Sequence, residues 1–244
     1  MDNSFNQESQ LHYYEDESND YEAGWIKRKT NRAFKRKSNI IKNAAGTSPD
    51  LKILEIGAGS GLLTYFTCSS IKCEKYIVSD LSPVMLKKAE ERLTKLKNTK
   101  AKEIDFEVID LYNLEKLNQK FDLIIGTDII HHLINPEFVL RNLQLLLNTS
   151  GKVVILETNI YNPIAWFGII GREHEIRAVL NTPDNFRTWL TKAGWNNFSV
   201  KPAPSFTPAG PVILHPLLDL IDKSLVRVPI LNKICALWLI EASK

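Results

Sequence analysis

The chain has 244 residues, of which 44% are hydrophobic and 24% are charged, and its formal net charge is +3. This length and composition are typical of a globular protein with a sizeable buried core, and so small a net charge gives no reason to expect a nucleic-acid partner. The three cysteines, Cys68, Cys73 and Cys235, form no CxxC pair, which favours reduced thiols in the cytoplasm. The acidic N-terminus lacks the apolar core of a secretion signal, and no stretch is long and apolar enough to predict a membrane span.

Two segments of different character precede the first predicted strand. Residues 1–24 are polar and acidic, and we expect them to be a flexible N-terminus. Residues 25–45 predict a basic helix with a thin apolar seam, which Gly46 ends. This helix is either a solvated lid over the rest of the chain or a surface that attracts the phosphates of a substrate or of an anionic membrane.

A glycine-rich turn follows the first predicted strand, within residues 52–64. The apolar strand 53–56 leads directly into Gly57, Gly59 and Gly61, and a helix begins after them. Glycines at such a turn allow unusual backbone angles and let a ligand approach the main chain, while the helix directs its free N–H groups at that ligand. Asp80, at the end of the next strand, is placed to bind the paired hydroxyls of a ribose. Together these residues predict a nucleoside-cofactor site.

Strands and helices then alternate along the chain. The helices begin at Ser82-Pro83, Asn135-Pro136 and Thr182-Pro183, where a capping side chain precedes a first-turn proline. The predicted strands are residues 53–56, 76–80, 104–109, 121–127, 153–156, 198–200 and 234–242. This alternation predicts an α/β fold with a doubly wound, mostly parallel sheet, in a single domain that spans residues 25–244.

Two motifs resemble those of class I S-adenosylmethionine-dependent methyltransferases, in particular the small-molecule methyltransferases. ILEIGAGSG, residues 53–61, is similar to the first motif of that family, and DLSPVMLKKA, residues 80–89, to its second. The resemblance covers about residues 51–160. It implies a Rossmann-like methyltransferase fold with a seven-stranded sheet, one C-terminal strand antiparallel to the others, and an N-terminal helical lid. It also implies a cofactor half, 51–160, and an acceptor-side half, 161–244, with S-adenosylmethionine as the cofactor.

The resemblance assigns the cofactor contacts residue by residue. It implies that the methionine part is surrounded by Glu55, by the turn Gly57, Ala58, Gly59 and Gly61, and by the backbone of Thr127. Asp80 would hold the ribose hydroxyls and Leu81 would lie against the adenine. Asp110, followed by Leu111, would bind the adenine amino group. All of these positions are at or near strand ends, where ligands of open α/β sheets bind.

Methyl transfer requires a base only when the acceptor arrives protonated. The candidates are His131 and His132, just after the fourth strand, with His174 and Glu157 behind them. The alternative is that a histidine at the second position only packs the loop. Asp128, Glu157 and Asn159 are conceivable ligands of a magnesium ion, but their order does not match the catechol-type enzymes, and we expect no metal.

The acceptor is constrained mainly by what the sequence lacks. Thr127-Asp128-Ile129-Ile130 stands where amino-methylating nucleic-acid enzymes carry an Asn/Asp-Pro-Pro-aromatic motif, and no cysteine lies near the fourth strand, so nucleic acid is disfavoured. The segments 160–171 and 205–231 are apolar and aromatic. They belong either to the core or to a site for an apolar or lipid-linked acceptor met at a membrane surface.

We therefore expect a methyltransferase that acts on oxygen, nitrogen or carbon of a small organic or lipid-linked acceptor. One alternative is a nicotinamide-dependent Rossmann reductase, which Leu62 disfavours because the last fingerprint position is usually glycine or alanine. The other is a non-catalytic protein that only binds S-adenosylmethionine. The acceptor, the methylated atom and the oligomeric state stay open at this stage.

Overall fold

The computed structural model describes residues 30–46, 48, 50–163, 165–166, 173–203, 215–226, 228 and 231–244. The predicted flexible segment 1–24 lies outside the described residues, as do residues 25–29 of the basic helix and residues 167–171 and 205–214 of the apolar segments. The side chain of the candidate base His174 also lies outside them.

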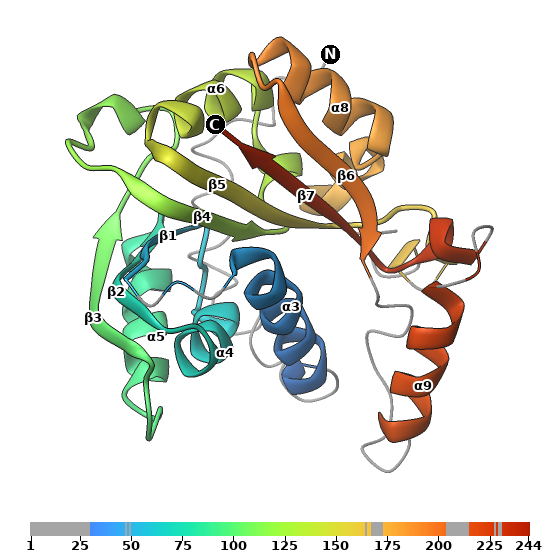
Figure 1. Ribbon diagram of the computed structural model, residues 1–244, viewed down its shortest axis with the longest axis horizontal. Coiled ribbons are helices and arrows are strands. Elements are labelled where there is room, and N and C mark those ends of the chain that lie inside the picture. The colour runs from blue at the N-terminus through green and yellow to red at the C-terminus, as the bar shows by residue number, and fades with distance from the viewer. Residues whose placement is uncertain are drawn as a thin grey trace.

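A seven-stranded sheet forms the centre of the described chain, in the order β3-β2-β1-β4-β5-β7-β6 (Figure 1). Its strands are β1 (Lys52–Ile56), β2 (Cys73–Asp80), β3 (Ala101–Val108), β4 (Phe121–Thr127), β5 (Leu147–Thr158), β6 (Asn197–Ala203) and β7 (Leu237–Ser243). Strands β1 to β5 pair in parallel, and β7 is antiparallel to both of its neighbours. The expected doubly wound sheet with one reversed C-terminal strand is confirmed.

Helices cover both faces of this sheet (Figure 1). One face carries α3 (Thr30–Ala45), α4 (Leu62–Ser70) and α5 (Pro83–Leu93), and the other carries α6 (Pro136–Leu145) and α8 (Pro183–Lys192). Each face has its own buried apolar cluster, because the strands between the helices alternate their side chains across the sheet. Trp195 and Phe186 are among the largest buried side chains under α6 and α8, and Tyr76 is the largest under α4.

The predicted helix starts are confirmed at atomic detail. The side chains of Ser82, Asn135 and Thr182 accept hydrogen bonds from backbone N–H groups three residues later, at 3.3, 3.1 and 3.2 Å. A proline occupies the first turn of each of these helices. Capping of this kind satisfies a donor that the helix cannot satisfy itself.

Only β4 has its predicted limits; the other six strands differ from theirs, and for three of them the reason is clear. β3 begins at Ala101 because its ladder with β2 extends back to the pair Cys73–Ala101. β5 begins at Leu147, since its pairing with β4 continues past an irregularity in register. β7 begins only at Leu237, because Ile234 belongs to a short 3₁₀ helix, η5 (Leu231–Ile234).

A last helix, α9 (His215–Val226), lies apart from the sheet and is joined to α3 by an ion cluster. Arg32 lies 2.6 Å from Asp219 and 3.1 Å from Asp222, and Arg36 pairs with the same two carboxylates. Asp222 is fully buried, and burial together with the charge of Arg32 lowers the pKa of Arg36. We refer to these four residues as the α3–α9 ion cluster. Among the described residues no helix is long and apolar enough to cross a membrane.

Candidate cofactor and active site

The glycine turn between β1 and α4 requires its glycines for different reasons. Gly57, Gly59 and Gly61 all have positive φ, at 61°, 54° and 75°. A Cβ at Gly57 would lie 2.5 Å from the Cδ1 of Ile129, and one at Gly61 would lie 2.9 Å from the Cα of Ala89. A Cβ at Gly59 would meet nothing within 4 Å. The turn is therefore packed at both ends and open in the middle, where a ligand has room to approach the backbone.

Asp80, at the carboxyl end of β2, faces this turn. Its Oδ2 accepts the N–H of Gly59 at 2.7 Å, and its Oδ1 accepts the N–H of Ser82 at 2.9 Å. Burial raises the pKa of Asp80, and these backbone N–H groups oppose the rise. The carboxylate thus links the turn to the start of α5 and has its orientation fixed from both sides.

A cavity opens beside the turn, at the carboxyl ends of β1, β2 and β4. The predicted site residues among those that line it are Gly57, Ala58, Gly59, Asp80, Leu81, Leu111, Thr127 and His132. Helix α3 contributes Phe34, and the loop after β4 contributes Asp128, Ile129, Leu133 and Ile134. The described lining does not include Glu55, Gly61, Asp110 or His131.

Glu55 and Asp110 both lie just outside the lining. Glu55 is buried behind the glycine turn, where its Oε2 accepts the hydroxyl of Tyr76 at 2.6 Å. Burial raises the pKa of Glu55 to about 7, against the effect of that hydrogen bond. Asp110 accepts the backbone N–H of Tyr112 at 2.9 Å, which shapes the turn whose residues Leu111 and Tyr112 do line the cavity.

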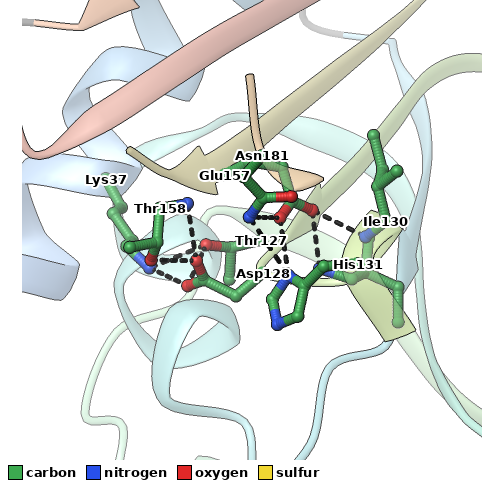
Figure 2. A network of polar contacts seen from close by, with 9 residues as sticks. Lys37, Thr127, Asp128, Ile130, His131, Glu157, Thr158 and Asn181 are labelled. Carbon is green, nitrogen blue, oxygen red and sulfur yellow. Dashed lines mark hydrogen bonds and ion pairs between the residues drawn. The ribbon is translucent and has the colours of Figure 1, made fainter. Parts of the chain in front are cut away.

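Asp128 is held on both carboxylate oxygens (Figure 2). Its Oδ1 accepts the N–H and the hydroxyl of Thr158 at 3.1 and 2.7 Å, and its Oδ2 accepts the hydroxyl of Thr127 and pairs with the ammonium of Lys37. Burial acts to raise the pKa of Asp128, but the charge of Lys37 and its hydrogen bond bring it well below the usual range. These bonds stabilise a backbone φ of 52°, which is rare outside glycine.

Glu157, at the end of β5, accepts four hydrogen bonds in a fully buried site. Its Oε1 accepts the N–H groups of Ile129 and Ile130 at 2.8 and 2.6 Å. Its Oε2 accepts Nδ1–H of His131 at 2.8 Å and the amide Nδ2 of Asn181 at 3.0 Å (Figure 2). Because a carboxylate only accepts here, His131 carries its proton on Nδ1 in this arrangement.

The two predicted histidines differ in position. His131 has a buried side chain next to Glu157, whereas His132 lines the cavity. Their rings lie 4.0 Å apart, tilted by 43°. His131 therefore lies in the wall between the carboxylate and the cavity-lining ring.

The sequence did not single out Asn181 or Lys37. Neither belongs to a recognised motif, and each reaches its partner from a segment far away along the chain. The suggested metal ligands are also engaged elsewhere, since Asn159 donates to the carbonyls of Lys233 and Cys235. Within the described part of the chain no group of three His, Cys, Asp or Glu residues is arranged to hold a metal ion.

The fold and this site together define a Rossmann-like protein of the methyltransferase type. Residues 54–153 match the family model described as a methyltransferase domain. The solved structure of the plantazolicin methyltransferase BpumL in complex with S-adenosylhomocysteine (SAH) shares the fold, with a TM-score of 0.61 and 16% identity, over 99% of this chain and 92% of that one. Residues 54–153 thus match a methyltransferase domain, in a fold that the chain shares with an SAH-bound methyltransferase, and both findings indicate S-adenosylmethionine as the cofactor.

Two relatives show how this domain occurs in other proteins. A highly reducing polyketide synthase of Emericella nidulans is 30% identical over 151 residues, which cover 58% of this chain and 6% of that protein. A malonyl-(acyl-carrier protein) O-methyltransferase of a Paenibacillus species is 28% identical over 118 residues, which cover 48% of this chain and 42% of that protein. The chain thus spans less than half the length of either relative.

Proposed function

We propose that the protein is an enzyme that transfers the methyl group of S-adenosylmethionine to a small acceptor in the cavity beside His132. The observation that carries the proposal is that the glycine turn, Asp80 and His132 meet in one cavity. They lie at the carboxyl ends of parallel strands, where ligands of open α/β sheets bind. The family match of residues 54–153 supplies the cofactor class.

The residues around Asp80 fit an adenosine. Each oxygen of this carboxylate accepts one backbone N–H, from Gly59 or Ser82, and retains a lone pair for one hydroxyl of a ribose. Leu81 and Leu111 offer apolar surface for the adenine. Asp110 is the proposed acceptor of the adenine amino group.

The turn fits the methionine part of the cofactor. Gly57, Ala58 and Gly59 present backbone without bulky side chains, and Thr127 lines the cavity beside them. Glu55 supports the turn from behind through Tyr76. We place the methionine between this turn and Thr127, with α3 as the lid that contributes Phe34.

The cofactor, when bound, supplies a methyl group on a positively charged sulfur. This chain's residues then need to align the acceptor, exclude water and take up a proton. We propose that the His131–Glu157 pair takes up the proton that the acceptor loses. Nδ1–H of His131 is donated to Glu157, so Nε2 is the basic nitrogen, and it faces away from Glu157 (Figure 2). A hydroxyl or an acidic C–H of the acceptor would give its proton to the ring of His132, which lines the cavity, and that ring would pass a proton to Nε2 of the buried His131. The oxygen or carbon of the acceptor would take the methyl group, and the sulfur would lose its positive charge and leave as SAH.

The acceptor end of the cavity supports an apolar substrate. Phe34, Ile129, Leu133 and Ile134 make up this end, next to His132. The two relatives, a polyketide synthase and an O-methyltransferase of malonyl-acyl-carrier protein, make polyketide-type and acyl acceptors the first class to test.

Cofactor binding is tested by calorimetry with SAH. The wild-type protein should bind SAH, and Asp80→Ala should weaken binding by about 1.5–3 kcal/mol, roughly 10- to 150-fold, because a carboxylate bound to two hydroxyls is lost. Asp105→Ala, a change on the exposed side of β3, is the control and should leave the affinity unchanged. Equal affinities for wild type and Asp80→Ala would contradict the ribose assignment, and no binding by the wild type would end the proposal.

Turnover is tested by release of SAH with a panel of acyl thioesters, phenols, carboxylic acids and amines. For an acceptor that arrives protonated, His131→Asn should lower kcat by about 10²-fold or more, as expected for loss of a positioned base. If only His132→Asn lowered kcat, the base would be the cavity-lining ring of His132 rather than His131. No turnover with any class of acceptor would favour a protein that only binds the cofactor.

Peripheral contact with a membrane is a second proposal, supported by the surface of α9 and α3. Leu217, Leu220 and Ile221 are 54%, 62% and 37% exposed and lie on one side of α9 at helical spacing. Lys35 and Lys42 are exposed on α3, which the ion cluster joins to α9. An apolar helix face next to basic side chains suits the surface of an anionic bilayer.

Co-sedimentation with phosphatidylglycerol vesicles tests this contact. The wild-type protein should bind in low salt, and the double change Leu217→Ser and Leu220→Ser should reduce binding at least fivefold. Equal sedimentation of variant and wild type, or none by either, would refute the contact. The cytoplasmic location is likewise a proposal, supported by Cys68, Cys73 and Cys235, which are buried and not disulfide-bonded.

A further inference from the structure

Asn181 connects the acceptor-side half of the chain to the candidate base. It lies between the 3₁₀ helix η3 (Glu173–Leu180) and α8, and it is fully buried. Its backbone N–H donates to the carbonyl of Ala178 at 3.0 Å, so the main chain fixes its position. From there its amide Nδ2 donates to Oε2 of Glu157 at 3.0 Å and lies 3.4 Å from Nδ1 of His131 (Figure 2).

The amide of Asn181 shares one oxygen of Glu157 with the imidazole. Oε1 is occupied by two backbone donors, from Ile129 and Ile130, which hold the carboxylate against the turn. Among the described residues, Oε2 accepts from Asn181 and from His131. A buried carboxylate requires donors on both oxygens, and a donor beside the imidazole limits how the carboxylate and the ring can move relative to one another.

We propose that Asn181 is a positioning residue for the His131–Glu157 pair. It orients Oε2 of Glu157 so that the imidazole keeps its proton on Nδ1 and presents Nε2 as the base. Asn181 touches neither the acceptor nor the cofactor in this role and acts through Glu157. The consequence for catalysis rests on the proposed function. The effect of Asn181 on the His131 ring is measurable without any acceptor.

The charges around His131 determine the direction of the expected effect. The titratable side chains placed close to His131 by the described contacts are Glu157 on β5, Asp128 after β4 and the adjacent His132. Loss of the neutral donor Asn181 leaves Glu157 less stabilised as an anion and therefore a stronger partner for the imidazolium. The protonated ring then gains stability relative to the neutral ring.

The test is ¹⁵N NMR of the His131 ring in the full chain, with and without SAH. Asn181→Leu, which has the same branched side-chain skeleton but is larger and has no donor, should raise the titration midpoint of His131 by about one pH unit, a tenfold change in proton affinity. Asn185→Leu is the matched control: Asn185 is four residues away and donates to the carbonyl of Leu180 rather than to Glu157, so its loss should not shift the His131 signals.

A second variant keeps the test decisive if the leucine variant fails to fold. Asn181→Asp keeps the shape, replaces the donor with an acceptor, and should also raise the midpoint. Where an acceptor has been found, both variants should lower kcat about tenfold while the Kd of SAH changes less than twofold. Ring signals and titration equal to those of the wild type would overturn the inference. Failure of the wild type to bind SAH would overturn the proposed function alone.

Discussion

Gly59 and Gly61 occupy the same turn and have similar backbone angles, yet their surroundings differ. Both have positive φ, so a side chain at either position is strained. Only Gly61 also lacks space, because the backbone of Ala89 on α5 lies where a Cβ would be. The close packing of α4 on α5 therefore depends on Gly61, whereas the open space at Gly59 belongs to the cavity.

This difference predicts the cost of two matched substitutions. Gly59→Ala should destabilise the protein by about 1 kcal/mol through backbone strain alone. Gly61→Ala adds overpacking against a main chain that cannot move aside, for a total of about 2–4 kcal/mol. Urea unfolding of the two variants without cofactor measures the difference, and equal losses would contradict the packing argument.

At the scale of single residues, sequence reasoning found the groups whose role depends on local chain geometry. The glycines and Asp80 follow from a strand that turns into a helix. Asn181 and Lys37 were missed because their roles exist only when distant segments meet, and an asparagine before a helix or a lysine in a basic helix gives no local signal. The finer cofactor contacts of Glu55 and Asp110 stay predictions.

Among the helices, α3 forms ion pairs with the rest of the described chain at two places. Its pocket-side contact is Lys37 with Asp128, and its outer contact is the α3–α9 ion cluster. The apolar seam of α3 packs with Ile40 and Ile41 buried against the sheet side. Because the apolar seam of α3 is thin, the Lys37–Asp128 pair and the α3–α9 ion cluster help to set the orientation of this helix.

The pocket-side contact predicts a pH dependence. The pKa of Asp128 is lowered in the folded protein, so its ion pair contributes stability above the unfolded value, about 3.9, and that stability is lost as pH falls below it. Lys37→Met should cost about 2 kcal/mol at pH 7, with a smaller difference from wild type near pH 3. Lys35→Met, at an exposed position of the same helix, is the control. Urea unfolding across this pH range measures both, and a constant difference would contradict the pairing.

The ion cluster predicts unequal effects of its two carboxylates. Asp222→Asn leaves Arg32 and Arg36 without a fully buried counter-charge and should cost about 3–5 kcal/mol. Asp219 has a side chain that is 47% exposed, so Asp219→Asn should cost less than about 1 kcal/mol. Thermal unfolding ranks the two variants, and hydrogen exchange of α9 shows whether the helix detaches. A larger loss for Asp219→Asn would contradict the cluster's geometry.

The element limits were predictable where a capping group defines them. Ser82, Asn135 and Thr182 mark helix starts through one side-chain bond each, and the structure confirms all three. The strand limits were less certain from sequence, because a strand ends where its partner ends. β3 and β5 extend beyond their apolar cores since β2 and β4 continue to offer backbone partners.

On the scale of the whole molecule, the proposed cofactor site joins segments that are far apart in the sequence, at the carboxyl ends of the parallel strands. The cavity takes residues from α3, from the turn before α4 and from the loop after β4. A ligand that binds only the folded chain stabilises it by mass action. SAH at 100 times its Kd should add about 2.7 kcal/mol and raise the Tm by about 5–10 °C.

Differential scanning fluorimetry with SAH measures this shift. Asp80→Ala should show a smaller shift at the same concentration, because its affinity is lower. NADH is the control ligand, and a shift with NADH but not with SAH would favour the nicotinamide-dependent alternative.

The place of β7 between β5 and β6 has a consequence for the order of assembly. β6 is synthesised before β7, which is its one partner in the described part of the sheet, and β7 (Leu237–Ser243) begins about forty residues after the start of β6. During translation the nascent β5 edge and the whole of β6 are therefore open to other strands, and only the arrival of β7 closes both ladders at once. The growing polypeptide therefore exposes two open strand edges, which are prone to pair with other chains, until β7 has been synthesised.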